Sequence, residues 1–118
     1  SRTLSRMLVK TVSPEGTAPQ AQIPGMEVAG KTGTAQRLKE TGGYSDTEVD
    51  VSFIGYFPAS DPRLVITVVI YNPQEGIRYG GQLAGPVFKR VAEQLIHLQG
   101  ISPKAAIRGF LAMDAPEE

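Results

Sequence analysis

The eight residues from Leu64 to Tyr71 constrain the fold of this chain more than any other feature. They read Leu-Val-Ile-Thr-Val-Val-Ile-Tyr, a run that is rich in β-branched side chains and has little polar interruption. β-Branched residues favour strands, and an apolar run without alternation is typical of a strand that is covered on both faces. We therefore predict a covered strand over residues 64–71, at the centre of a sheet.

Two further segments complete the predicted sheet. Residues 27–35 contain few bulky side chains, which indicates a strand that something else approaches closely, and residues 51–57 form a second strand that ends at Pro58. The polar residues 39–50 between them include Gly42-Gly43, which predicts a mobile loop. Because short connections permit hairpins and not crossovers, the three strands should pair in antiparallel fashion.

Apolar residues at helical spacing flank these strands. Residues 2–12 form an amphipathic pattern, and a second row, which steps by four and three, comprises Ala84, Phe88, Val91, Leu95 and Leu98. Gly100 and Pro103 predict the end of that second helix. The order helix, three strands, helix predicts an α+β fold, an antiparallel sheet flanked by N- and C-terminal helices.

The two ends of the chain differ in organisation. The first helix begins almost at residue 1, with little upstream to cap or cover it, so we expect the chain to be part of something longer. Residues 104–118 have weak periodicity, Gly109 and an acidic end, which predict a loosely attached or disordered tail. The organised part is therefore expected to span residues 1–103.

Composition excludes several classes of function. The 12 basic and 12 acidic residues cancel, so no electrostatic footprint for nucleic acid is present. The absence of cysteine excludes a disulfide framework and thiolate metal sites, and we expect neither a metal nor a cofactor. The apolar run at residues 64–71 is too short to span a bilayer, so any membrane anchor is expected outside this chain.

The segment Lys31-Thr32-Gly33-Thr34 is the clearest candidate for a functional site. It combines a compact cation, two hydroxyls and a glycine that lets a ligand approach the backbone, and an exposed strand can donate N–H groups to a developing oxyanion. This arrangement suits acyl transfer on a substrate that bears a carboxylate, although it supplies no nucleophile. The simpler alternatives are a solvated strand lysine and threonines chosen for β-propensity.

Other polar residues are weaker candidates. Gln36, Arg37 and Lys39 follow the tetrad and could touch a substrate, but charged residues where a strand meets a loop are usually solvated. Arg78 likewise could contact a substrate, but a role on the solvated surface is more usual for such a residue. The single histidine, His97, has no serine or carboxylate partner placed by sequence, which favours a surface or packing role.

Four blocks in a fixed order carry a resemblance to a known family. They are Lys31-Thr32-Gly33-Thr34, then Phe53-Ile54-Gly55-Tyr56-Phe57-Pro58, then Tyr79-Gly80-Gly81, and then Ala84-Gly85-Pro86-Val87-Phe88. Together they resemble the C-terminal part of a penicillin-binding protein transpeptidase domain, most closely of the class B, monofunctional type. The resemblance covers residues 1–103 and implies a serine D,D-peptidase and β-lactamase-like fold.

The family's active site combines three motifs, and this chain contains one of them. No serine is followed three positions later by lysine, and no Ser-x-Asn occurs, so S-x-x-K and S-x-N are absent. The acylated serine would therefore come from the remainder of the domain, either in the same parent protein or in a companion chain. The isolated chain should not form an acyl-enzyme.

The resemblance implies a peptidoglycan D,D-transpeptidase whose partners are stem peptides ending in D-Ala-D-Ala and the β-lactams that mimic them. Lys31 would attract the substrate carboxylate and hold the S-x-N serine, the hydroxyls of Thr32 and Thr34 would bind that carboxylate, and the backbone N–H of Thr34 would be an oxyanion-hole donor. Gly33 would leave room for substrate to pair with the strand. Tyr79-Gly80-Gly81 would lie near the same cleft, or form an ordinary turn.

Three alternatives stay open. A D,D-carboxypeptidase or serine β-lactamase shares the tetrad, a non-catalytic β-lactam sensor keeps the pocket without turnover, and a structural fragment would have a vestigial pocket. The family resemblance also implies an extracytoplasmic location, in the periplasm or on the outer face of the bacterial inner membrane.

Overall fold

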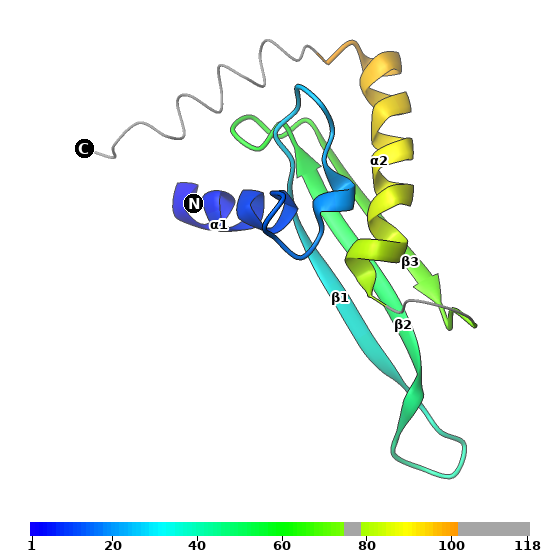
Figure 1. The fold of residues 1–118 in the computed structure, drawn as a ribbon. Coiled ribbons are helices and arrows are strands. Elements are labelled where there is room, and N and C mark those ends of the chain that lie inside the picture. Colours follow the sequence, from blue (N-terminus) through cyan, green and yellow to red (C-terminus); the bar gives the residue numbers. More distant parts are fainter. Residues whose placement is uncertain (75–78, 102–118) are drawn as a thin grey trace.

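In the computed structural model, which describes residues 1–74 and 79–101, a three-stranded antiparallel sheet packs against two α-helices. The elements are α1 (Arg2–Val12), a short 3₁₀ turn (Pro19–Ala21), β1 (Ala29–Leu38), β2 (Tyr44–Phe57), β3 (Leu64–Tyr71) and α2 (Gly80–Gln99) (Figure 1). This order confirms the predicted α+β class. Among the described residues, no helix combines the length and apolar character needed to cross a membrane. The predicted tail at 104–118 lies outside the described residues.

The strand order is β1-β2-β3, so the predicted position of the third strand was wrong. The bounds of β3 agree with the prediction, but β2 is the central strand because two successive hairpins place the middle segment between its neighbours. The residues of β3 alternate between half-buried and exposed, with Val65 64% and Tyr71 73% exposed. In the described part of the chain one face of this strand is therefore open, although its sequence has the apolar character of a strand covered on both.

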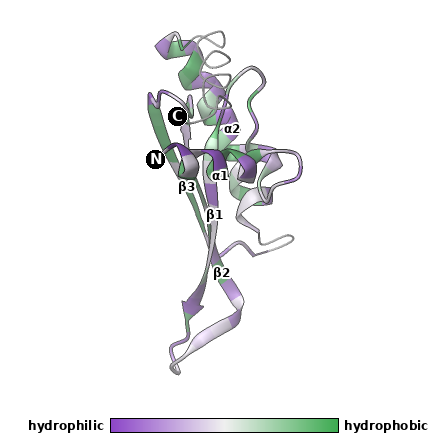
Figure 2. Ribbon diagram, turned by 90° about the vertical axis from the view of Figure 1, so that its left-hand side faces the viewer, coloured by the Kyte–Doolittle hydropathy of each residue, from purple (hydrophilic) through white to green (hydrophobic). Residues whose placement is uncertain are grey.

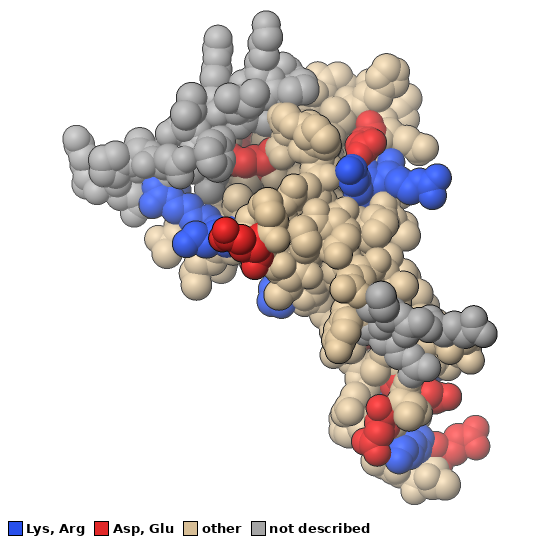
Figure 3. All heavy atoms as spheres, in the orientation of Figure 1, with Lys and Arg blue, Asp and Glu red and all other residues tan. Residues whose placement is uncertain are grey.

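The predicted loop at residues 39–50 was also largely wrong. Most of that segment, from Tyr44 to Asp50, belongs to β2, and its partner β1 extends to Leu38. The two strands form a hairpin arm that projects beyond the helices, and only residues 39–43 turn the chain (Figure 1). Polar residues can occupy this part of β2 because Tyr44 and residues 46–48 are exposed to solvent, although Ser45 is buried. Figure 2 shows the arm as mostly hydrophilic, and Figure 3 shows charges of both signs on it.

The core lies between α2 and one face of the sheet. Phe88 of α2 is fully buried, and its ring meets Phe53 at 4.8 Å and Phe57 at 6.1 Å, both edge-on. The buried side of α2 follows positions 84, 88 and 92 at steps of four, so Val91 and Leu98 from the predicted apolar row are exposed instead, at 39% and 76%. Gly100 ends the helix with a φ of 66°, the left-handed conformation that glycine adopts without strain.

Among the described residues, the opposite face of the sheet is covered only at one end. There α1 contributes Leu8 and Val9 to a small cluster with Ala29, and the hydroxyls of Ser5 and Tyr56 lie 2.8 Å apart. The remainder of that face, which we call the open face, carries exposed apolar side chains from the two neighbouring strands: Ile54, Val65, Val69 and Tyr71.

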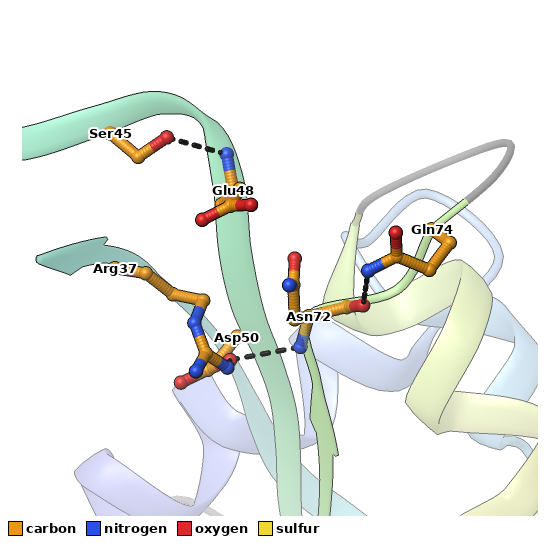
Figure 4. Close-up of polar contacts among 6 residues, drawn as sticks. All are labelled: Arg37, Ser45, Glu48, Asp50, Asn72 and Gln74. Carbon is orange, nitrogen blue, oxygen red and sulfur yellow. Dashed lines mark hydrogen bonds and ion pairs between the residues drawn. The ribbon is translucent and has the colours of Figure 1, made fainter. Parts of the chain in front are cut away.

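One carboxylate joins all three strands at the base of the hairpin arm. Asp50 of β2 accepts a hydrogen bond from the Arg37 guanidinium at 3.0 Å and another from the backbone N–H of Asn72 at 2.9 Å (Figure 4). Both side chains of the ion pair are partly shielded from solvent, with Arg37 38% and Asp50 29% exposed. Asp50 therefore fixes the arm to the end of β3.

We expect Asp50→Ala to lower the free energy of unfolding by about 1–2 kcal/mol, because it removes two charge-assisted hydrogen bonds from a partly shielded site. Asp61→Ala is the matched control, since its ion pair with Arg63 is longer, 3.5 Å, and its side chain is 78% exposed. That control should change stability by less than about 0.5 kcal/mol. Urea denaturation of both variants measures the difference, and equal losses would contradict the bracing role of Asp50.

Candidate functional site

The Lys31-Thr32-Gly33-Thr34 tetrad lies on β1, which is one of the two edge strands of the sheet in the described part of the chain. The Lys31 ammonium lies 3.1 Å from the carbonyl oxygen of Thr32 and 3.4 Å from its hydroxyl. Lys31 and Thr34 are exposed, whereas Thr32 and Gly33 are half-buried. The structure thus brings Lys31 and Thr32 into direct contact at an accessible edge.

The strand register assigns the four residues to two faces. Lys31 and Gly33 lie opposite Ile54 and Ser52, which places them on the open face of the sheet. Thr32 and Thr34 lie opposite Phe53 and Val51, whose side chains are buried on the α2 side. Because successive side chains of a strand point to opposite faces, the cation and the two hydroxyls flank the strand edge from both sides.

The backbone of β1 follows the same alternation. The carbonyl of Glu27, two residues before the strand, accepts a hydrogen bond from the N–H of Ala59 at 3.0 Å, on the side that faces β2. Odd-numbered residues of β1 therefore pair with β2, and the N–H and C=O groups of Thr32 and Thr34 point to the free edge. The contact of Lys31 with the Thr32 carbonyl agrees with this arrangement. In the part of the chain that the structure describes, the tetrad thus presents backbone donors without a strand partner beside an ammonium group.

Glycines allow the close packing around the tetrad. A Cβ on Gly33 would lie 2.6 Å from the Ser52 hydroxyl, and a Cβ on Gly30 would lie 2.3 Å from the ring of Phe53. Gly80, in the first turn of α2, is buried against the backbone of Gly33 and Ser52. Tyr79-Gly80-Gly81 is therefore no ordinary turn: it begins a helix that rests on the tetrad strand.

The weaker candidates have structural roles or remain exposed. Arg37 forms the ion pair with Asp50, while Gln36, Lys39 and His97 are exposed. Arg78 lies outside the described residues. Within residues 1–74 and 79–101, no group of three or more histidine, aspartate or glutamate side chains could hold a metal ion.

Sequence reasoning did not place Ser52 at this site. Its hydroxyl faces Gly33 across the hairpin, yet it belongs to neither S-x-x-K nor S-x-N. The register that pairs these two residues depends on where the hairpin turns, and the polarity of residues 39–50 concealed that turn. The alternation of apolar and polar residues in Val49-Asp50-Val51-Ser52-Phe53 is the signal that could have extended the predicted strand toward it.

Comparison with known proteins finds one family. The sequence model of the penicillin binding protein transpeptidase domain matches residues 1–93. Stage V sporulation protein D of Bacillus subtilis is 39% identical over 99 residues, which is 84% of this chain and 15% of that protein. The probable peptidoglycan D,D-transpeptidase PenA of Neisseria gonorrhoeae is 36% identical over 103 residues, 87% of this chain and 18% of that protein. The chain thus spans less than a fifth of the length of these relatives.

Comparison with solved structures finds the same family. Penicillin-binding protein 3 of Mycobacterium tuberculosis, solved in complex with ampicillin, superposes with a TM-score of 0.74 at 32% sequence identity. The match covers 85% of this chain and 24% of the solved one. The α+β arrangement described above therefore corresponds to about a quarter of a longer chain in that protein.

Proposed function

The chain belongs to the penicillin binding protein transpeptidase domain family, and from this premise we propose that it supplies the substrate-binding edge strand of a serine-type peptidoglycan D,D-transpeptidase. The observation that carries the proposal is the tetrad on β1, where an ammonium group and unpaired backbone donors share an exposed edge. Relatives that match the chain include a probable peptidoglycan D,D-transpeptidase and a penicillin-binding protein crystallised with ampicillin.

In the proposed site each member of the tetrad has a distinct task. Lys31 and the hydroxyls of Thr32 and Thr34 bind the carboxylate of a stem peptide that ends in D-Ala-D-Ala, or of a β-lactam. The backbone N–H of Thr34 points to the free edge, where it donates to the oxyanion that forms when the substrate carbonyl is attacked. The extended substrate pairs with β1 as an added strand, and the missing side chain of Gly33 leaves the open face beside it unobstructed.

The nucleophile comes from outside this chain. We assign it to the serine of an S-x-x-K motif in the remainder of the domain, which also carries S-x-N. The open face supports this assignment, because Ile54, which lies opposite Lys31, is 48% exposed and Val69 of β3 is 43% exposed. Contiguous exposed apolar residues mark surfaces that another part of a protein covers. The remainder of the domain would cover this face and thereby bring its serine to the Lys31 ammonium.

The reaction then proceeds in two acyl transfers. The serine oxygen attacks the penultimate D-alanine carbonyl, the peptide bond breaks, and the terminal D-alanine leaves with the proton that the serine gives up. The amine of a neighbouring peptide then attacks the ester and restores the serine. We place this chemistry outside the cytoplasm, where peptidoglycan is cross-linked, with residues 1–103 as the C-terminal part of the domain and the membrane anchor in a separate segment.

Labelling with fluorescent penicillin tests the proposal. The complete protein should become covalently labelled, whereas residues 1–118 alone should remain unlabelled because their serines lie outside S-x-x-K. Labelling of the isolated chain would contradict the assignment of the nucleophile. If the complete protein stays unlabelled, the pocket is vestigial. Rapid hydrolysis of the acyl-enzyme would favour a β-lactamase. Long-lived acylation without cross-linking would favour a sensor.

A further inference from the structure

We propose that Gly80 is a positioning residue that sets where the tetrad strand lies, and this inference rests on the function proposed above. Gly80 is the first residue of α2 and is buried. A Cβ added there would lie 2.4 Å from the carbonyl oxygen of Ser52 and 3.1 Å from that of Gly33. Both neighbours are backbone atoms of the hairpin, and Gly33 is the third residue of the tetrad. The start of α2 thus rests directly on the strand that carries the site.

The other glycines of α2 do not touch this strand. A Cβ on Gly81 would lie 2.2 Å from the carbonyl oxygen of Thr17, in the segment that follows α1. A Cβ on Gly85 would have its nearest neighbour at 3.4 Å, which is an ordinary contact. A Cβ added to one of these glycines would therefore clash with the hairpin at Gly80, clash away from the hairpin at Gly81, and make only an ordinary contact at Gly85, all within two turns of one helix.

Substitution of Gly80 would move the hairpin. To reach an ordinary separation of 3.4 Å from Ser52, the two backbones would have to separate by 1.0 Å. The α2 helix is held by the buried ring of Phe88, and Ser52 of β2 pairs directly with Gly33 of β1, so a shift of the backbone at Ser52 carries Gly33 with it. We therefore expect the hairpin to yield at Gly33 and Ser52. This displaces the Thr34 N–H, and a misplacement of about 1 Å in a catalytic constellation can cost roughly a hundredfold in rate.

The experiment compares Gly80→Ala, Gly81→Ala and Gly85→Ala in the complete protein. Acylation by fluorescent penicillin is measured below all melting temperatures, and the melting temperatures are recorded separately. We expect G80A to be acylated at least tenfold more slowly than the wild type. G81A should lose comparable thermal stability but keep its acylation rate within about twofold, and G85A should resemble the wild type in both measurements.

If G81A loses acylation in step with its loss of stability, the effect is one of general folding and the proposal is overturned. The proposal is also overturned if G80A is acylated at the rate of the wild type. If even the wild type is not acylated, it is the proposed function that fails.

Should G80A not accumulate as folded protein, Phe88→Leu takes its place, because it loosens α2 over the hairpin. Ile96→Val at the far end of α2 is its control. Phe88→Leu should slow acylation and Ile96→Val should not. Equal acylation rates of these two variants would overturn the proposal.

Discussion

Lys31→Ala in the complete protein should slow acylation by penicillin about a hundredfold while leaving the melting temperature nearly unchanged. The ammonium of Lys31 lies at the free edge of the sheet, 3.1 Å from the Thr32 carbonyl, where a substrate carboxylate would meet it. A hydrogen bond to a charged group contributes about 1.5–3 kcal/mol, which corresponds to roughly 10- to 150-fold in rate when it is lost from the transition state. Because Lys31 is exposed, its removal should barely affect folding.

Lys39→Ala is the matched control for that experiment. Lys39 is also exposed and lies just beyond the end of the same strand, but it is remote from the tetrad. Its loss should leave the acylation rate within about twofold of the wild type. Lys31→Arg should recover part of the rate, since it keeps the charge but replaces a compact ammonium by a larger planar group. If Lys31→Ala were acylated as fast as Lys39→Ala, Lys31 would be an ordinary solvated lysine.

The sequence predicts the elements of the fold better than their arrangement. The helix bounds at residues 2–12 and the strand at residues 64–71 agree with the structure because local periodicity and β-propensity determine them. The position of the third strand depends on which segments it pairs with, and composition does not contain that information. The apolar character of residues 64–71 is better explained by the remainder of the domain, which we propose covers the open face.

The hairpin arm illustrates a second limit. A strand whose residues are mostly polar has the composition of a loop, so residues 44–50 could not be distinguished from a loop by polarity. The error extends to the site, because the register that sets Gly33 opposite Ser52 is counted through that arm. The tetrad itself was recognisable, since its residue types carry the chemistry. Its packing partners Ser52 and Gly80 became visible only when the backbone was placed.

Phe88→Ala should lower the free energy of unfolding of the complete protein by about 3–5 kcal/mol, the largest stability effect that we expect from a single substitution. Phe88 is the central contact between α2 and the sheet: its ring meets Phe53 at 4.8 Å with an interplanar angle of 69° and Phe57 at 6.1 Å with an angle of 89°. All three rings are fully buried. Truncation removes the buried apolar surface and two edge-on aromatic contacts, and it leaves a cavity that Gly55, which lies beneath the ring, cannot fill.

Leu98→Ala is the control for this loss, because Leu98 lies on the same helix but is 76% exposed. It should change stability by less than about 0.5 kcal/mol when both variants are unfolded in urea. The comparison also separates stability from catalysis, since Phe88 fixes the helix whose first residue rests on the tetrad strand. Below its melting temperature, Phe88→Ala should therefore also be acylated more slowly than Leu98→Ala. A Phe88→Ala protein as stable as the control would contradict the role of Phe88 in holding α2 to the sheet, on which the expected displacement of the hairpin in Gly80→Ala depends.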